Sequence, residues 1–111
     1  MIKRTVFFIS DSTGITAKTL GQSVLSQFEN VNFETIMIPY VDDVEKAHAA
    51  LKRIAQAQLT DGLAPIIFDT VINRELSAIL SQAQGCRFDL LNTYLKPLEA
   101  ELKVQSSERV G

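Results

Sequence analysis

Short runs of apolar residues recur along the chain at nearly equal intervals. They occupy residues 5–9, 33–38 and 64–68, so their starts are separated by about the length of one β–α–β unit. The first and third runs do not alternate between apolar and polar residues, which is typical of strands buried on both faces of a parallel sheet. This spacing constrains the fold more than any other feature of the sequence.

The segments between these strands carry the apolar stripe of an amphipathic helix. In residues 15–28, Leu20, Val24 and Phe28 lie four positions apart and predict a stripe that faces the core. A second helix over residues 43–59 follows an expected N-cap at Asp42 and ends at Gly62. Its expected core residues are Val44, Ala47, Leu51, Ile54 and Leu59.

The last third of the chain continues the same alternation. Asn73 is expected to cap a third helix that ends at Gly85, and residues 88–91 predict a short fourth strand. A final helix is expected to have Pro97 in its first turn and to contain Leu95, Leu98 and Leu102.

Strands of the buried type that alternate with amphipathic helices predict an α/β fold. We expect three layers, with a mostly parallel four-stranded sheet and helices on both faces, of the flavodoxin-like or Rossmann-like type. Residues 1–105 are expected to form this single domain, and the polar residues 106–111 a linker or a frayed end.

Composition excludes several classes of partner. The net charge is −2 and there is no block of Lys and Arg, so we expect no binding to nucleic acid. No apolar run approaches the roughly 20 residues that a membrane span needs. The single cysteine, Cys86, excludes an internal disulfide, favours a cytoplasmic location and is expected to be buried.

The turn after the first strand is rich in hydroxyl groups. It should leave the carboxyl end of that strand and open the first helix, where free N–H groups and the helix dipole favour an anion. The candidate phosphate-binding residues are Ser10, Asp11, Ser12, Thr13, Gly14 and Thr16. The carboxylate of Asp11 would repel phosphate unless it points away, binds a metal or accepts a hydroxyl proton. The alternative is that these side chains only cap the helix.

Two further segments are expected at the same edge of the sheet. Asp69 and Thr70 follow the third strand, and Tyr40 follows the second, so we take all three as candidate residues that line a cleft. The alternatives are that Asp69 and Thr70 only cap the entry to the next helix and that Tyr40 belongs to an ordinary turn. The sequence contains no Walker P-loop, no G-x-G-x-x-G motif and no Cys/His cluster of the metal-binding kind. No metal is therefore expected, and no catalytic residue is assigned.

The sequence also resembles a known family. Residues 4–17 (RTVFFISDSTGITA) are similar to the N-terminal signature of the bacterial regulatory proteins of phosphoenolpyruvate synthetase and pyruvate,phosphate dikinase. Further similarity lies at residues 26–28 (SQF), 65–68 (PIIF), 89–91 (DLL) and 97–99 (PLE). The resemblance covers about residues 4–102, and it differs at Ser77, where an arginine is expected.

The resemblance implies a bifunctional enzyme that controls its target by reversible phosphorylation. An ADP-dependent kinase activity would inactivate the target by phosphorylating a threonine, provided that the target carries its phosphohistidine intermediate. A phosphate-dependent pyrophosphorylase activity would remove that phosphate. ADP and inorganic phosphate are thus implied as substrates of the full-length family, and no cofactor is expected in this chain.

The resemblance also implies that this chain is the N-terminal domain of a longer protein. The nucleotide-binding P-loop of the family lies in a C-terminal kinase domain outside this chain, so we do not expect this chain to be active alone. The implied partners are the target enzyme and that missing domain, and the sequence leaves self-association open. Two other functions remain open, namely a flavodoxin-like module that binds phosphate or flavin, with Tyr40 and Tyr94 flanking the ring, and a non-catalytic docking or dimerisation domain.

Overall fold

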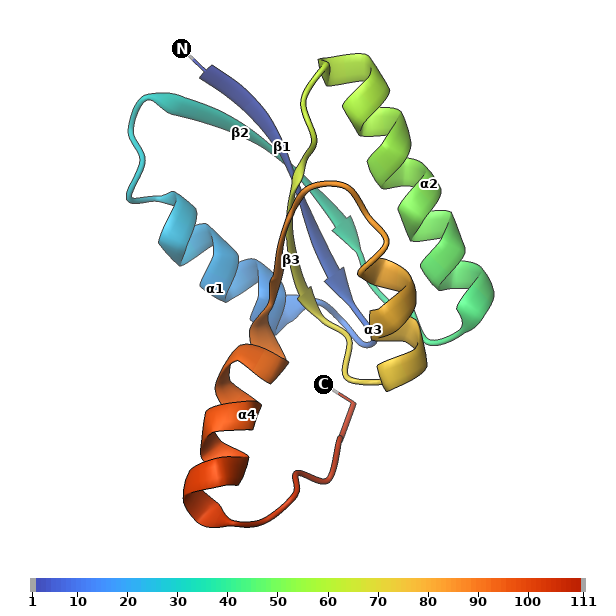
Figure 1. The fold of residues 1–111 in the computed structure, drawn as a ribbon. Coiled ribbons are helices and arrows are strands. Elements are labelled where there is room, and N and C mark those ends of the chain that lie inside the picture. Colours follow the sequence, from blue (N-terminus) through green and yellow to red (C-terminus); the bar gives the residue numbers. More distant parts are fainter. Residues whose placement is uncertain (1, 111) are drawn as a thin grey trace.

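The structure, a computed structural model, describes residues 2–110, in which strands and helices alternate along the chain (Figure 1). The four strands in this range form one parallel sheet in the order β2-β1-β3-β4. The elements are β1 (Ile2–Ser10), α1 (Ile15–Leu25), β2 (Val31–Ile38), α2 (Val44–Asp61), β3 (Ile66–Thr70), α3 (Arg74–Leu80), β4 (Cys86–Asp89) and α4 (Leu90–Leu102). The predicted α/β fold with a parallel four-stranded sheet is therefore confirmed, and its strand order is the flavodoxin-like one.

The core has two parts because successive residues of a strand point to opposite faces of the sheet. Phe7 and Ile9 of β1 pack with the apolar residues of α2 and α3 on one face. Val6 and Phe8 point to the other face and pack with α1. The central strand is thus buried on both sides, which explains its continuous apolar run.

The face of α1 that packs on the sheet differs from the predicted one. The buried residues of α1 are Ala17, Gly21 and Leu25, whereas Val24 is 45% and Phe28 58% exposed. A Cβ atom at Gly21 would lie 2.4 Å from a ring carbon of Phe8, so only a residue without a side chain allows this close approach. Ala17, Gly21 and Leu25 therefore face the sheet, whereas Val24 and Phe28 turn outward.

Helix α2 begins one residue later than expected. Asp43, not Asp42, is the N-cap, and its carboxylate accepts a hydrogen bond of 2.8 Å from the backbone N–H of Lys46. Asp42 instead forms an exposed ion pair with the Lys46 side chain. The helix ends at Gly62 as predicted, but Val44 and Leu59 are exposed rather than buried.

The transition from β4 to α4 also differs from the prediction. The Asp89 carboxylate accepts a hydrogen bond of 3.1 Å from the backbone N–H of Asn92 and so caps a helix that begins at Leu90. The strand consequently ends at Asp89, and Pro97 lies inside the helix instead of in its first turn. Cys86 is exposed, contrary to expectation.

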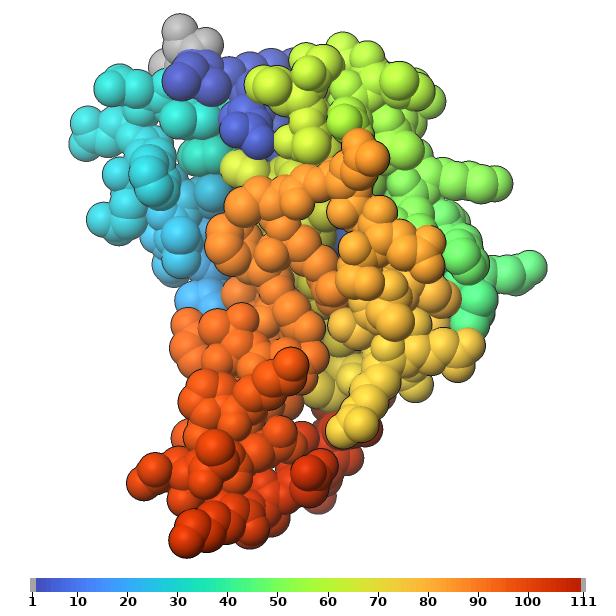
Figure 2. All heavy atoms as spheres, in the orientation of Figure 1, coloured from blue at the N-terminus to red at the C-terminus, as the bar shows by residue number. Residues whose placement is uncertain are grey.

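Helix α4 differs from the other helices in that none of its residues is buried. Figure 2 shows it projecting from one end of the molecule together with the residues that follow it. Of those residues, Glu108 forms an ion pair of 2.9 Å with Arg74 of α3. Among residues 2–110, no helix combines the length and the apolar character needed to cross a bilayer.

Candidate functional site

Three loops meet at the carboxyl edge of the sheet, next to the point where the strand order reverses between β1 and β3. The backbone N–H of Tyr40 donates to the carbonyl oxygen of Ser12 at 2.9 Å, and that of Val41 donates to the carbonyl oxygen of Ser10 at 2.8 Å. The N–H of Ile72 donates to the Asp11 carboxylate at 3.0 Å. The loops after β1, β2 and β3 are thereby joined into one surface.

Two of the candidate hydroxyl groups are used inside the protein. Ser10 and Thr70 are both buried, and the Thr70 hydroxyl donates to the Ser10 hydroxyl at 3.2 Å. The Ser10 hydroxyl also accepts a hydrogen bond of 3.0 Å from the backbone N–H of Ser12. These side chains fix the shape of the turn, and they would not contact a ligand.

The Asp11 carboxylate points away from the mouth of the loop. It is buried and accepts the Ile72 N–H from the loop after β3. Asp11 would repel a phosphate bound at the loop only if its carboxylate faced that phosphate. The structure instead turns the side chain inward, which is one of the arrangements expected to avoid the repulsion. Asp11 serves to hold two loops together at the switch in strand order.

The outer part of the same loop is accessible. Thr13 and Thr16 are exposed and Ser12 is half-buried. Gly14, which is buried, is the N-cap residue of α1 and offers no side-chain cap, and the Thr13 hydroxyl accepts a long hydrogen bond of 3.5 Å from the Ile15 N–H. Gly14 has φ +86°, a conformation that side chains rarely adopt. Helix α1 has no acidic residue in its first turn, so no side chain of that turn neutralises the positive end of its dipole.

Tyr40 lies beside this accessible part of the loop. It is exposed and has φ 59°, which is uncommon for a residue other than glycine. Its backbone hydrogen bond to Ser12 fixes that conformation. Tyr40 and the outer residues of the first loop are thus brought together at one place.

Asp69 takes part in a buried ion pair instead of lining a cleft. Its side chain is 0% exposed, and the Arg87 guanidinium contacts it with two nitrogens, at 2.6 and 3.2 Å. Burial raises the pKa of the Asp69 carboxyl, and the hydrogen bond and charge of Arg87 partly oppose this shift. The pair ties β3 to β4 below the carboxyl edge.

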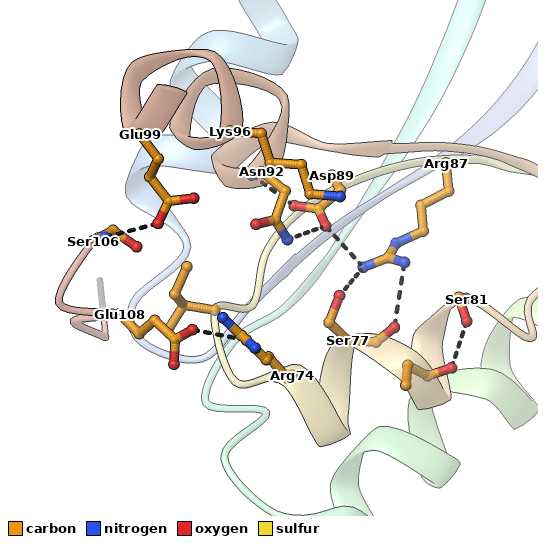
Figure 3. A pocket seen from close by; sticks show the side chains of 12 residues that line it. Arg74, Ser77, Ser81, Arg87, Asp89, Asn92, Lys96, Glu99, Ser106 and Glu108 are labelled. Atoms are coloured by element: carbon orange, nitrogen blue, oxygen red, sulfur yellow. Dashed lines mark hydrogen bonds and ion pairs between the residues drawn. The ribbon is translucent and has the colours of Figure 1, made fainter. Parts of the chain in front are cut away.

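Arg87 was not singled out by the sequence, although an arginine within a short strand is a signal for a paired buried charge. It also donates to the Ser77 hydroxyl at 2.9 Å and to the Ser77 carbonyl at 3.3 Å (Figure 3). The position at which the family resemblance implies an arginine is therefore contacted by a guanidinium from β4.

A cleft of about 520 Å³ lies between α3 and α4 (Figure 3). Its walls carry three cationic side chains and three carboxylates, so their formal charges cancel. The cleft does not include the first loop. Its charged lining residues are Arg74, Arg87, Lys96, Asp89, Glu99 and Glu108.

The chain is similar in sequence to one protein family and to several known proteins. The model of a protein family described as "Kinase/pyrophosphorylase" matches residues 6–111. A Pseudomonas aeruginosa protein named as a phosphoenolpyruvate synthase regulatory protein is 54% identical over 110 residues. Proteins with the same name from Pseudomonas fluorescens and Hahella chejuensis are 53% and 52% identical over the same length. Each match covers 99% of this chain but 40% of the relative.

Proposed function

The chain belongs to the kinase/pyrophosphorylase family, and we propose that it is part of a protein that regulates phosphoenolpyruvate synthase. The names of the relatives support this target over pyruvate,phosphate dikinase. Because the chain spans about 40% of their length, the activity is proposed for the longer polypeptide. The P-loop that the family resemblance implies would lie in the remaining part.

The proposed regulation consists of two phosphoryl transfers on one threonine of the target. In the kinase direction the threonine oxygen bonds to the terminal phosphorus of ADP, AMP leaves and the hydroxyl proton is released. In the other direction inorganic phosphate takes the phosphoryl group, so that free threonine and pyrophosphate form. Both steps require a site that holds phosphate groups while charge develops on their oxygens.

The loop after β1 is the part of this chain that best fits such a site. The single observation that carries this proposal is the N-terminus of α1, where the N-cap Gly14 has no side chain and the Thr13 hydroxyl accepts only a long hydrogen bond from Ile15, beside the exposed residues Thr13 and Thr16. Ser10, Asp11 and Thr70 would not contact phosphate, but they hold the loop in the shape that exposes these groups. The proposed phosphate contacts are therefore Ser12, Thr13, Gly14 and Thr16.

The strand order favours a second ligand for the same loop. Flavodoxins share the order found here and bind the flavin phosphate at the same switch between strands. Tyr40 is exposed and lies beside the loop, because its backbone N–H donates to the carbonyl oxygen of Ser12. A flavin mononucleotide is thus the alternative ligand, and it shares the phosphate with the first proposal.

Titration of the isotopically labelled chain followed by nuclear magnetic resonance tests the loop. Phosphate, pyrophosphate, ADP and flavin mononucleotide are added separately, and the amide signals of Gly14 and Thr16 are expected to shift saturably with pyrophosphate or ADP. The Thr13→Val and Thr16→Val variants should weaken binding. Thr19→Val, which changes an exposed threonine one turn further along α1, should not. Unchanged amide signals at millimolar pyrophosphate and ADP would exclude the loop as a phosphate site, and a response to the flavin alone would favour the alternative.

The regulatory activity needs the longer polypeptide. A chimaera in which this chain replaces the matched 110 residues of the Pseudomonas aeruginosa relative supplies it. The chimaera is expected to transfer the terminal phosphoryl group of ADP to a threonine of phosphoenolpyruvate synthase, and Thr13→Val to slow this transfer while Thr19→Val does not. Incorporation into a residue other than threonine, or none, would overturn the proposed reaction.

A further inference from the structure

An apolar groove of about 370 Å³ lies on the face of the sheet that α1 covers. It runs between the end of α1 and the edge strand β4. Phe88 of β4 is 45% exposed at one wall, and Phe28 lies at another. The further apolar lining residues are Ile2, Val24, Leu25, Val31, Phe33, Ile66 and Phe68.

A row of stacked rings connects this groove to the core. The rings of Phe8 and Phe68 are 5.9 Å apart, and those of Phe68 and Phe88 are 5.2 Å apart. Phe8 is fully buried, whereas Phe88 is nearly half exposed. The hydrophobic core therefore continues to the surface at this place, and it lacks an outer cover.

The groove is open because the helices cover the two faces of the sheet unequally. Both α2 and α3 contribute buried residues to one face, whereas α1 alone does so on the other. Helix α4 follows β4 and could cover the groove, but Figure 1 shows it extending away from the sheet. Within residues 2–110, β4 is also paired on one side only.

Several residues of the groove have the sequence pattern of a buried surface. Val24 and Phe28 belong to the stripe that the sequence predicts to face a core, yet both are exposed. A single exposed apolar residue is ordinary, but a contiguous apolar surface marks an interaction site. The pattern is explained if α1 packs on two sides, with its small residues against the sheet and these larger ones against another segment.

We propose that this groove is the docking surface for an apolar segment of the polypeptide that completes the longer relatives. The matched region is 40% of those relatives, so most of their chain lies outside it and is available to pack here. The lining does not favour a charged partner. Its only charged residue is Arg4, and the guanidinium of Arg4 already donates to the Ala64 carbonyl at 3.0 Å. A groove of about 370 Å³ accepts a few apolar side chains of one helix or strand.

Cys86 provides a direct test, because it is the single cysteine of the chain, lines the groove and is exposed. The rate at which a maleimide labels it is measured in this chain and in the chimaera described above, with the labelled peptide identified by mass spectrometry. We expect labelling in the chimaera to be slower by about tenfold or more, since it would require the docked segment to open. The readout needs no enzymatic activity, so it is independent of the proposed reaction.

Two variants of the chimaera separate docking from a general change in the protein. Phe28→Asp is expected to restore fast labelling of Cys86, whereas Leu59→Asp, on the exposed side of α2, should leave it slow. Equal labelling rates in the folded chimaera and in this chain would overturn the proposal without any variant. Protection of Cys86 in this chain alone that grows with concentration, together with sedimentation as a dimer, would also overturn it, because the occupant would then be a second copy.

Discussion

Replacement of Arg87 by methionine is expected to destabilise the fold by about 3–5 kcal/mol at neutral pH, the cost of leaving one partner of a buried ion pair without the other. We use the magnitude for a buried ion pair because the Asp69 side chain is 0% and the Arg87 side chain 16% exposed. Two guanidinium nitrogens contact the carboxylate, and Ser77 accepts two further hydrogen bonds. Methionine keeps much of the side-chain length but supplies no donor.

The loss should shrink as the pH falls. Burial raises the pKa of the Asp69 carboxyl above its ordinary value of 3.8, and Arg87 opposes that shift, so the Arg87→Met variant has the higher folded-state pKa. At a pH between the pKa of Asp69 in the unfolded chain and its higher pKa in the folded protein, the folded protein binds more protons than the unfolded chain. The stability of the folded protein therefore rises as the pH falls through the folded-state pKa. Each unit of additional pKa shift corresponds to about 1.4 kcal/mol. The difference between parent and variant is therefore largest at neutral pH and smaller near pH 4.

Urea-induced unfolding followed by circular dichroism between pH 4 and 7 measures this difference. Asp69→Asn added to Arg87→Met removes the unpaired charge, so the double variant should be more stable at pH 7 than Arg87→Met and should lose its excess pH dependence. If Arg87→Met costs less than about 1 kcal/mol, the range of an exposed pair, the pair is not buried in solution. A pH-independent loss in the single variant would show that the carboxylate charge is not its cause.

Substitutions at three further positions are expected to lower the free energy of unfolding, which urea titration measures in each case. Gly21→Ala should cost a net of about 1 kcal/mol, because overpacking against Phe8 at 2.4 Å outweighs the gain in helix propensity; a stabilised variant would contradict the close approach of α1. Asp11→Ala should cost about 1–3 kcal/mol by leaving the Ile72 N–H without its acceptor, and Asp11→Asn less, since an oxygen remains; equal losses would argue against that bond. Asp43→Ala should cost about 1 kcal/mol as the loss of an N-cap. An unchanged free energy of unfolding would show that Asp43 does not cap α2 in solution.

The order and type of the elements could be predicted because each is encoded locally. Residues 6–9 of β1 form a continuous apolar run, and α2 ends at a glycine with φ +74°. The face that α1 turns to the sheet could not be predicted in the same way. A hydrophobic pattern favours Val24 and Phe28, but the approach of the helix to the Phe8 ring is decided by the absence of a side chain at Gly21. Packing between elements, rather than periodicity, selects that face.

The place of the hydroxyl-rich turn in the fold could be predicted from the sequence, whereas the division of its residues into internal and exposed ones could not. The hydroxyl-rich turn could be located because it joins a strand to a helix. Which side chains are used internally depends on the neighbouring strand, since Ser10 bonds to Thr70 and Asp11 to the N–H of Ile72, about 60 positions away. Sequence types alone do not distinguish these two residues from Thr13 and Thr16, which stay exposed.

The two proposed surfaces lie at opposite ends of the strands, and this separation has a consequence for the longer polypeptide. The groove is lined by the first residues of β1 and β2, among them Arg4 and Phe33, whereas the loop at Thr13 lies beyond the carboxyl end of β1. A segment docked in the groove would therefore leave the loop accessible. The same polypeptide could anchor on one end of the domain and present its nucleotide to the other, so filling the groove and binding phosphate are expected to be compatible. Phe28→Asp in the chimaera should accordingly impair the regulatory activity without weakening pyrophosphate binding to the loop, and a parallel loss of both would show that the two surfaces are not independent.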